Sequence, residues 1–258
     1  MNRTILCTVL ALGLIATQPT EVTAGAGGWG ALKAQGAQAV LAAADKTHNS
    51  FKTQVWVFRM TLKPAGGAAS RTMKFKIWQK GSRRLVRFLE PGDLKGMSVL
   101  MRSPTVMYVY SPQTDNVRRV ASHARRQSFL GSDVSLSDMS TVDLSAQYNA
   151  TFGRESGDSQ WLTLRAKPGA KVDWSMLKVR VHKKTRSFSR IEYFHNGRRR
   201  KVQDRSRLKI MSGIPTYRRS VFIDMKSKHR TILDMLSQKT NTPLPSSLFK
   251  KRNLIRGG

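Results

Sequence analysis

The feature of this sequence that most constrains its fold is a succession of short segments in which apolar and polar side chains alternate. In the segment 51–63, Trp56, Phe58 and Met60 share one face, as expected for a strand that buries one side. Turn residues follow, and similar segments recur at a spacing of roughly ten residues, which is typical of a sandwich or barrel. The sequence therefore predicts a mainly β chain of antiparallel strands with a few helices.

The strands are expected to form one curved sheet. A single-sheet barrel of about eleven strands is too wide to be filled by its own side chains, so helices must plug it or a ligand must occupy it. We expect an Ala-rich helix over 31–49, a hairpin at Asn196-Gly197, and a short helical cover over 128–140. Residues 198–205 and 207–210 are interpreted as separate strands, and 229–235 fits a strand or a helix.

The N-terminal residues 1–24 are typical of a secretory signal. Arg3 precedes an apolar run over 5–16 that suits a signal core but is too short to span a bilayer, and small residues over 22–24 suit cleavage. An uncleaved anchor is the alternative. The mature chain, 25–258, would be a single domain without cysteine, because Cys7 lies in the removed segment. These features predict export through a cleavable signal peptide to the periplasm.

The chain carries a large and uneven positive charge. Its 46 lysines and arginines outnumber 15 aspartates and glutamates, for a formal net charge of +31. Behind an export signal, the expected polyanions are phospholipid or lipopolysaccharide head groups rather than nucleic acid, since each basic residue near an anionic membrane contributes about 1 kcal/mol. Adaptation to the salt or pH of the host is the alternative. The predicted basic surface comprises Arg198, Arg199, Arg200 and Lys201.

Recognisable catalytic and metal-binding patterns are missing from the sequence. The five histidines are scattered without metal-ligand spacing, and no nucleophile elbow, phosphate-binding loop or dinucleotide fingerprint occurs. Gly131-Ser132-Asp133 places an acid beside a hydroxyl, but no histidine is positioned to act as the base. We therefore predict no catalytic residue, metal or cofactor. A cavity would need a mobile lid, which is expected over 128–143. The lid and helix-cap candidates are Ser132 and Asp133, together with Ser135 and Asp138 in the spacing of a capping box.

Large apolar side chains on the predicted strands are candidates for a ligand cavity as well as for a core. Methionine, with 11 residues, is plentiful and adapts to irregular partners. The cavity candidates are Trp56, Phe58, Met60, Met73, Phe75, Ile77, Phe88, Val99, Met101, Phe129 and Leu130.

A short turn, Phe129-Leu130-Gly131-Ser132-Asp133, carries the strongest resemblance to a known family. The runs 108–112 and 117–120 precede it, a turn over 90–96 lies upstream, and the tail 244–254 closes the chain. Together they resemble the outer-membrane lipoprotein-sorting protein family, the LolA-like group, over most of the mature chain. The resemblance implies an unclosed antiparallel β-barrel covered by helices, with an apolar cavity for acyl chains and no cofactor.

The resemblance also implies a function. Family carriers are not enzymes; they hold the lipid of a lipoprotein and deliver it across the periplasm toward the outer membrane. The expected partners are lipid or lipoprotein acyl chains, an anionic membrane surface or lipopolysaccharide, and an inner-membrane export complex, with the carrier itself a monomer. In the carrier an interior arginine helps to hold the lid shut, but no arginine here lies in a matching motif. The strong basic charge departs from the carrier pattern and leaves the cargo open.

Two other functions compete with the carrier interpretation. A basic adaptor could bind polyanions or membrane surfaces without any lipid cavity, with steep salt dependence. An enzyme acting on a lipid or glycan would require a histidine near an acid in a cleft.

Overall fold

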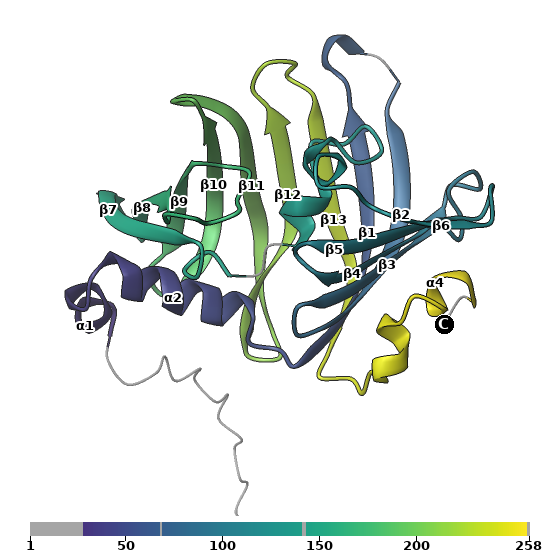
Figure 1. The fold of residues 1–258 in the computed structure, drawn as a ribbon. Coiled ribbons are helices and arrows are strands. Elements are labelled where there is room, and N and C mark those ends of the chain that lie inside the picture. Colours follow the sequence, from purple (N-terminus) through teal and green to yellow (C-terminus); the bar gives the residue numbers. More distant parts are fainter. Residues whose placement is uncertain (1–27, 68, 141–142, 257–258) are drawn as a thin grey trace, which may run out of the picture.

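A computed structural model describes residues 28–67, 69–140 and 143–256, so the predicted signal peptide, 1–24, lies outside the described residues. Thirteen antiparallel strands form one curved sheet in the order β6-β5-β4-β3-β2-β1-β13-β12-β11-β10-β9-β8-β7 (Figure 1). Their bounds are β1 Thr53–Lys63, β2 Arg71–Lys80, β3 Arg83–Glu90, β4 Ser98–Ser103, β5 Val106–Ser111, β6 Asn116–Arg119, β7 Tyr148–Ser156, β8 Ser159–Ala166, β9 Met176–His182, β10 Ser187–His195, β11 Arg198–Met211, β12 Ile214–Asp224 and β13 Arg230–Thr240.

The sheet is curved but not closed. Strands β6 and β7 lie at its two edges and do not pair with each other, so the sheet is an unclosed barrel. It has thirteen strands, whereas the sequence predicts a barrel of roughly eleven. The first and last strands of the sheet in sequence, β1 and β13, pair along their length in the middle. Segments far apart in the chain thus join the sheet's two halves.

Local sequence accounts for several strand ends. Asn196 and Gly197 both have positive φ, 49° and 72°, as the predicted hairpin turn between β10 and β11 requires. The interpretation of 198–205 and 207–210 as two strands is wrong, because β11 continues through Arg207 in the left-handed region and keeps its pairing with β12. Most of the ambiguous segment 229–235 is strand, because β13 begins at Arg230 and pairs with both β1 and β12.

Helices cover the concave face of the sheet on both halves. The helix expected over 31–49 is two helices, α1 Trp29–Ala34 and α2 Ala37–His48, because Gly36, at φ 99°, breaks the chain direction between them. Helix α2 buries Val40 and Leu41 against β8–β10. The short helix α3, Leu136–Ser140, follows the 3₁₀ turn η2, Ala124–Arg126, and packs over β1–β5. A further 3₁₀ turn, η1 Ala65–Gly67, ends β1.

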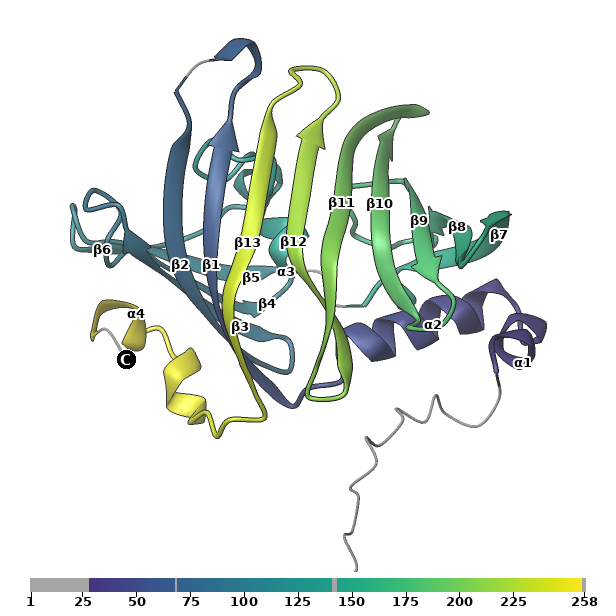
Figure 2. The same cartoon turned by 180° about the vertical axis from the view of Figure 1, so that it is seen from behind.

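The C-terminal tail covers the opposite, convex face (Figure 2). It contains the 3₁₀ turn η3, Ser246–Phe249, and the helix α4, Asn253–Arg256. Strand alternation turns Leu85 and Leu100 toward this tail, where both are fully buried. The side chain of Arg87 fixes the tail further, because its Nη2 donates to the carbonyl of Asn253 at 3.0 Å.

Leu100→Ala tests the packing of the tail. Leu100 is 0 % exposed, so the truncation should leave a cavity and lower the free energy of unfolding by about 2–5 kcal/mol. Leu208→Ala is the matched control, since Leu208 is 36 % exposed and should change it by about 0.5 kcal/mol or less. Equal effects of the two variants in urea denaturation would show that the tail is not packed as described.

Candidate functional site

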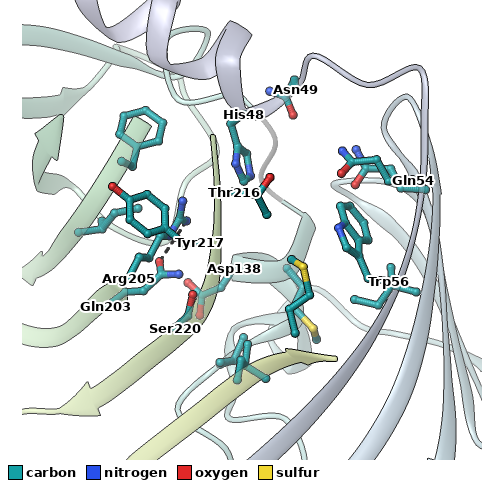
Figure 3. A pocket seen from close by; sticks show the side chains of 18 of the residues that line it. His48, Asn49, Gln54, Trp56, Asp138, Gln203, Arg205, Thr216, Tyr217 and Ser220 are labelled. Carbon is teal, nitrogen blue, oxygen red and sulfur yellow. Dashed lines mark hydrogen bonds between the residues drawn. The ribbon is translucent and has the colours of Figure 1, made fainter. Parts of the chain in front are cut away.

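A cavity of about 310 Å³ lies on the concave side of the sheet, where the two halves meet. Strands β1–β4, β7 and β9–β13 contribute to its lining. The end of α2 and the segment 128–140 around α3 (the α3 segment, or cover) border it (Figure 3). Its volume is in the range of small-molecule sites in proteins. The wall has an apolar part, built mainly by β1, β2 and β13, and a polar part near the end of α2.

The apolar part of the wall is rich in aromatic and sulfur-containing side chains. Trp56, Phe58 and Met60 project from alternate positions of β1, and the rings of Phe58 and Phe75 stack with centroids 5.9 Å apart. Leu233 extends the same surface from β13. Such a surface can bury an acyl chain but offers it no hydrogen bonds.

The structure divides the predicted cavity residues into two groups. Those that line the cavity are Trp56, Phe58, Met60, Phe75, Ile77 and Met101. The others do not line it and lie instead in the packed cluster under the α3 segment: Met73, Phe88, Val99, Phe129 and Leu130. Phe129 packs on Phe88 with ring centroids 6.0 Å apart, so the cover packs against this part of the concave face.

The cover carries the capping box that its sequence spacing predicts. The amide of Asp138 donates to Ser135 Oγ at 3.0 Å, and the amide of Ser135 donates to Asp138 Oδ2 at 2.9 Å. Val134 and Met139 of the same segment line the cavity. Residues 141–142 of the predicted lid, 128–143, lie outside the described residues.

The interpretation of Ser132 and Asp133 as helix caps is wrong. Ser132 Oγ donates to the carbonyl of Phe129 at 2.7 Å and closes the turn. Asp133 accepts hydrogen bonds at Oδ2 from Thr231 Oγ1 at 2.8 Å and pairs with His229 Nδ1 at 2.7 Å. These contacts fix the turn to β13 rather than starting α3.

The prediction that Lys201 belongs to a basic surface is also wrong, because the residue is buried. Strand alternation turns it inward, where its Nζ donates to Asp138 Oδ2 and lies over the rings of Trp174 and Tyr193, at 4.9 and 4.6 Å. The Lys201 and Asp138 side chains are 8 % and 7 % exposed, so this ion pair is buried and joins the cover to β11. Of the other predicted basic residues, Arg198 and Arg199 are exposed, whereas Arg200 is half-buried.

The polar part of the cavity was not anticipated from the sequence. His48, at the end of α2, faces it between β11 and β1 (Figure 3). Gln79 and Arg84 reach it from β2 and β3, and Gln203 and Arg205 from β11. Strand alternation predicts that these four side chains point inward, because each lies two residues from another inward-facing side chain of the same strand.

The electrostatics of this part are unusual. Desolvation in the cavity wall and the nearby charges of Arg205 and Arg84 lower the pKa of His48 below its ordinary value, although part of the residue is exposed, so the neutral imidazole is favoured. Burial also lowers the pKa of Arg84 to about 10 and lowers that of Arg205. Both guanidinium groups stay charged at neutral pH.

A buried acid borders the cavity beside the cover. Asp45 of α2 accepts a hydrogen bond from the amide of Ser145 at 2.7 Å. Burial raises the pKa of Asp45 to about 7, and the neighbouring Asp143 carboxylate adds to this rise. At neutral pH the Asp45 carboxyl is therefore close to its titration point.

The described residues contain no cluster that could hold a metal ion. The one histidine–aspartate ion pair among them, His229 with Asp133, does not line the cavity. None of the described helices combines the length and apolarity needed to cross a bilayer.

Comparison with known proteins places the fold. A family model described as "Uncharacterized protein" matches residues 80–256. None of the curated proteins matches the sequence. Among solved structures, a DUF1329 family protein from Desulfovibrio piger is 24% identical, with a TM-score of 0.76 over 83% of this chain and 96% of that one.

Two further solved structures resemble the chain closely in fold. An outer membrane lipoprotein-sorting protein domain from Vibrio parahaemolyticus is 18% identical, with a TM-score of 0.75, covering 85% of this chain and 98% of that one. A LolA superfamily protein from Nitrosomonas europaea is 20% identical, with a TM-score of 0.71, covering 84% and 99%. The fold is therefore the LolA-like one that the sequence resemblance implied.

Asp138→Asn tests the buried ion pair. Removing the carboxylate leaves Lys201 charged and buried, which should lower the free energy of unfolding by about 3–5 kcal/mol. Adding Lys201→Met should recover most of this loss. Arg71→Gln is the control, since it breaks an exposed pair with Asp93 and should cost about 1 kcal/mol or less. A loss no larger than that of the control would contradict the described role.

The raised pKa of Asp45 predicts a pH dependence. At pH values between the ordinary pKa of 3.8 and the folded value of about 7, Asp45 keeps its proton in the folded state but loses it in the unfolded state. The stability that this proton contributes is therefore complete below the lower pKa and is lost as the pH rises through the higher one. Over that interval the free energy of unfolding should fall by a few kcal/mol, on the order expected for such a shift. Asp45→Asn should flatten this decline in urea denaturation, whereas Asp158→Asn, at an exposed position, should not. A wild-type slope unchanged by Asp45→Asn would refute the assignment.

Proposed function

The chain belongs to the family whose model matches residues 80–256, and we propose that it carries a lipid, or the acyl chains of a lipoprotein, in the cavity of its LolA-like sheet. The observation that supports this most is the apolar wall formed by Trp56, Phe58 and Met60 beneath a separate cover. The cavity contrasts with the filled region under Phe129, where the same kind of side chain packs against the cover.

Burial of the cargo supplies the binding free energy. Each acyl CH₂ moved from water into the cavity contributes about 0.8 kcal/mol, so a long chain approaches about 10 kcal/mol before the costs of ordering. Met60, Met101 and Met139 line the cavity and can adjust their shapes to chains of different packing. The protein itself needs no catalytic group, cofactor or metal for this function.

The proposed transport runs through the periplasm toward the outer membrane. Neighbours in fold are described as an outer membrane lipoprotein-sorting protein domain and a LolA superfamily protein, which supports a periplasmic carrier that moves its cargo toward the outer membrane. The predicted signal peptide over 1–24 agrees with such a location.

The hairpin of β11 and β12 is the proposed contact with the donor or acceptor membrane. Ile214 and Pro215 on this hairpin line the cavity, while Leu208 and Ile210 are 36 % and 54 % exposed beside Lys209. Exposed apolar residues next to a cation suit an anionic lipid surface. A lipid could then pass between the membrane and the cavity along one hairpin.

The basic charge does not require a different function. On the convex face, Arg190 binds Asp204 at 2.7 Å and Arg219 binds Asp234 at 2.6 Å, so part of the positive charge is neutralised locally. A basic adaptor without a lipid cavity remains the competing function, and it makes the opposite prediction for substitutions inside the cavity.

Phe58→Gln separates the two functions. Phe58 lines the cavity, so the amide should weaken the binding of dodecanoate by about tenfold, since it removes apolar contact and must itself be desolvated. Binding is followed by the fluorescence of Trp56 and Trp174, which also line the cavity. Phe152→Gln is the matched control, because Phe152 is 41 % exposed and lies outside it.

The competing adaptor would bind heparin equally well in all three proteins and would show no saturable fluorescence change with dodecanoate. That pattern, with the variant folded by circular dichroism, would rule out the carrier function.

A further inference from the structure

Two arginines at the polar part of the cavity lack an acidic partner within the described residues. Arg84 Nε donates to Gln79 Oε1 at 2.8 Å, and Arg205 Nη2 lies 3.4 Å from Gln203 Oε1. Both partners are neutral glutamines, which position the guanidinium groups without neutralising them. No ion pair joins either arginine to a described carboxylate.

The acids that line the cavity are engaged elsewhere. Asp138 is held by Lys201 and by Ser135, and the carboxyl of Asp45 faces the amide of Ser145. Neither is therefore available to Arg84 or Arg205. The contrast with the convex face is clear, because there Arg190 and Arg219 both have carboxylate partners.

Arg84 and Arg205 are half-buried, and a charge that has lost part of its hydration without gaining an ionic partner is costly to the folded state. The glutamines that hold these arginines are themselves well buried: Gln79 is 5 % exposed and Gln203 is 6 % exposed. Tyr193 Oη also donates to Gln203 Oε1 at 3.1 Å and fixes its orientation. Buried glutamines therefore hold both guanidinium groups in the cavity wall, where an anion could supply the missing ionic partner.

His48 completes this part of the wall from the helical side. It projects from the end of α2 toward the cavity on the side of Arg205 (Figure 3), and the charges of Arg205 and Arg84 favour its neutral imidazole. A neutral imidazole can donate one hydrogen bond to an oxyanion without adding a third positive charge.

We propose that Arg84 and Arg205 bind the oxyanion, a carboxylate or phosphate, of a lipid head group whose acyl chain occupies the apolar part of the cavity. This inference rests on the proposed carrier function and narrows its cargo to an anionic amphiphile. Guanidinium groups suit this role because they bind carboxylate and phosphate through paired, charge-assisted hydrogen bonds. A cavity of about 310 Å³ suits a single chain with a compact head group.

The chain and the head group can be tested separately. Dodecanoate and dodecyl phosphate carry the anion, whereas 1-dodecanol has the same chain length without charge, and inorganic phosphate has charge without a chain. Wild-type protein should bind the two anionic amphiphiles about tenfold to a hundredfold more tightly than dodecanol, the range that charge-assisted hydrogen bonds supply. It should bind inorganic phosphate far more weakly than dodecyl phosphate.

Variants then assign the preference to the arginines. Arg84→Gln with Arg205→Gln should bring dodecanoate down to about the affinity of dodecanol, and dodecanol should still bind. The doubly substituted Arg84→Lys with Arg205→Lys keeps the charges and should retain a preference for the anion. Arg199→Gln, at an exposed position of β11, is the control and should bind like wild type.

Each outcome bears on the inference differently. Equal affinity of wild type for dodecanoate and dodecanol would overturn the anion site while leaving the lipid carrier intact. Binding of neither amphiphile would overturn the carrier function and the inference with it. Phosphate binding as tight as that of dodecyl phosphate would show a free-phosphate site instead of a lipid head-group site. Dodecanol binding that persists in the glutamine variant shows that the variant is folded.

Discussion

The pairing of β1 with β13 is the constraint on which the rest of the structure depends. It joins two half-sheets that are separately covered, one by α2 and the other by the α3 segment. A curved sheet of this width cannot fill its own concave face with side chains. The two covers meet incompletely, and the cavity is the space between them.

The cavity therefore combines surfaces of different origin. Its apolar wall comes from alternate positions of the central strands, and its polar wall from residues opposite the end of α2. Since an amphiphile has the same division into chain and head group, the two walls together describe one class of ligand. The buried pair of Lys201 with Asp138 holds the cover in place without using the arginines that face the cavity.

The sequence was sufficient for the fold class, the strand periodicity and the family resemblance, because these depend on local patterns. It was not sufficient to separate cavity from core. Met73 and Phe88 alternate as regularly as Phe58, yet only the placement of a cover from far along the chain decides which of them meets free space. The position of Lys201 could not be predicted for the same reason, since the basic run around it indicates a surface and its partner Asp138 lies on another element.

The central claim is that the cavity holds a lipid, and the most direct measurement is mass spectrometry of what the protein retains when purified under native conditions. Protein isolated from an exporting host without detergent should carry a stoichiometric acyl lipid that organic extraction removes, and delipidated protein should take it up again. Repeated purifications that yield neither a bound lipid nor uptake by the folded protein would contradict the account.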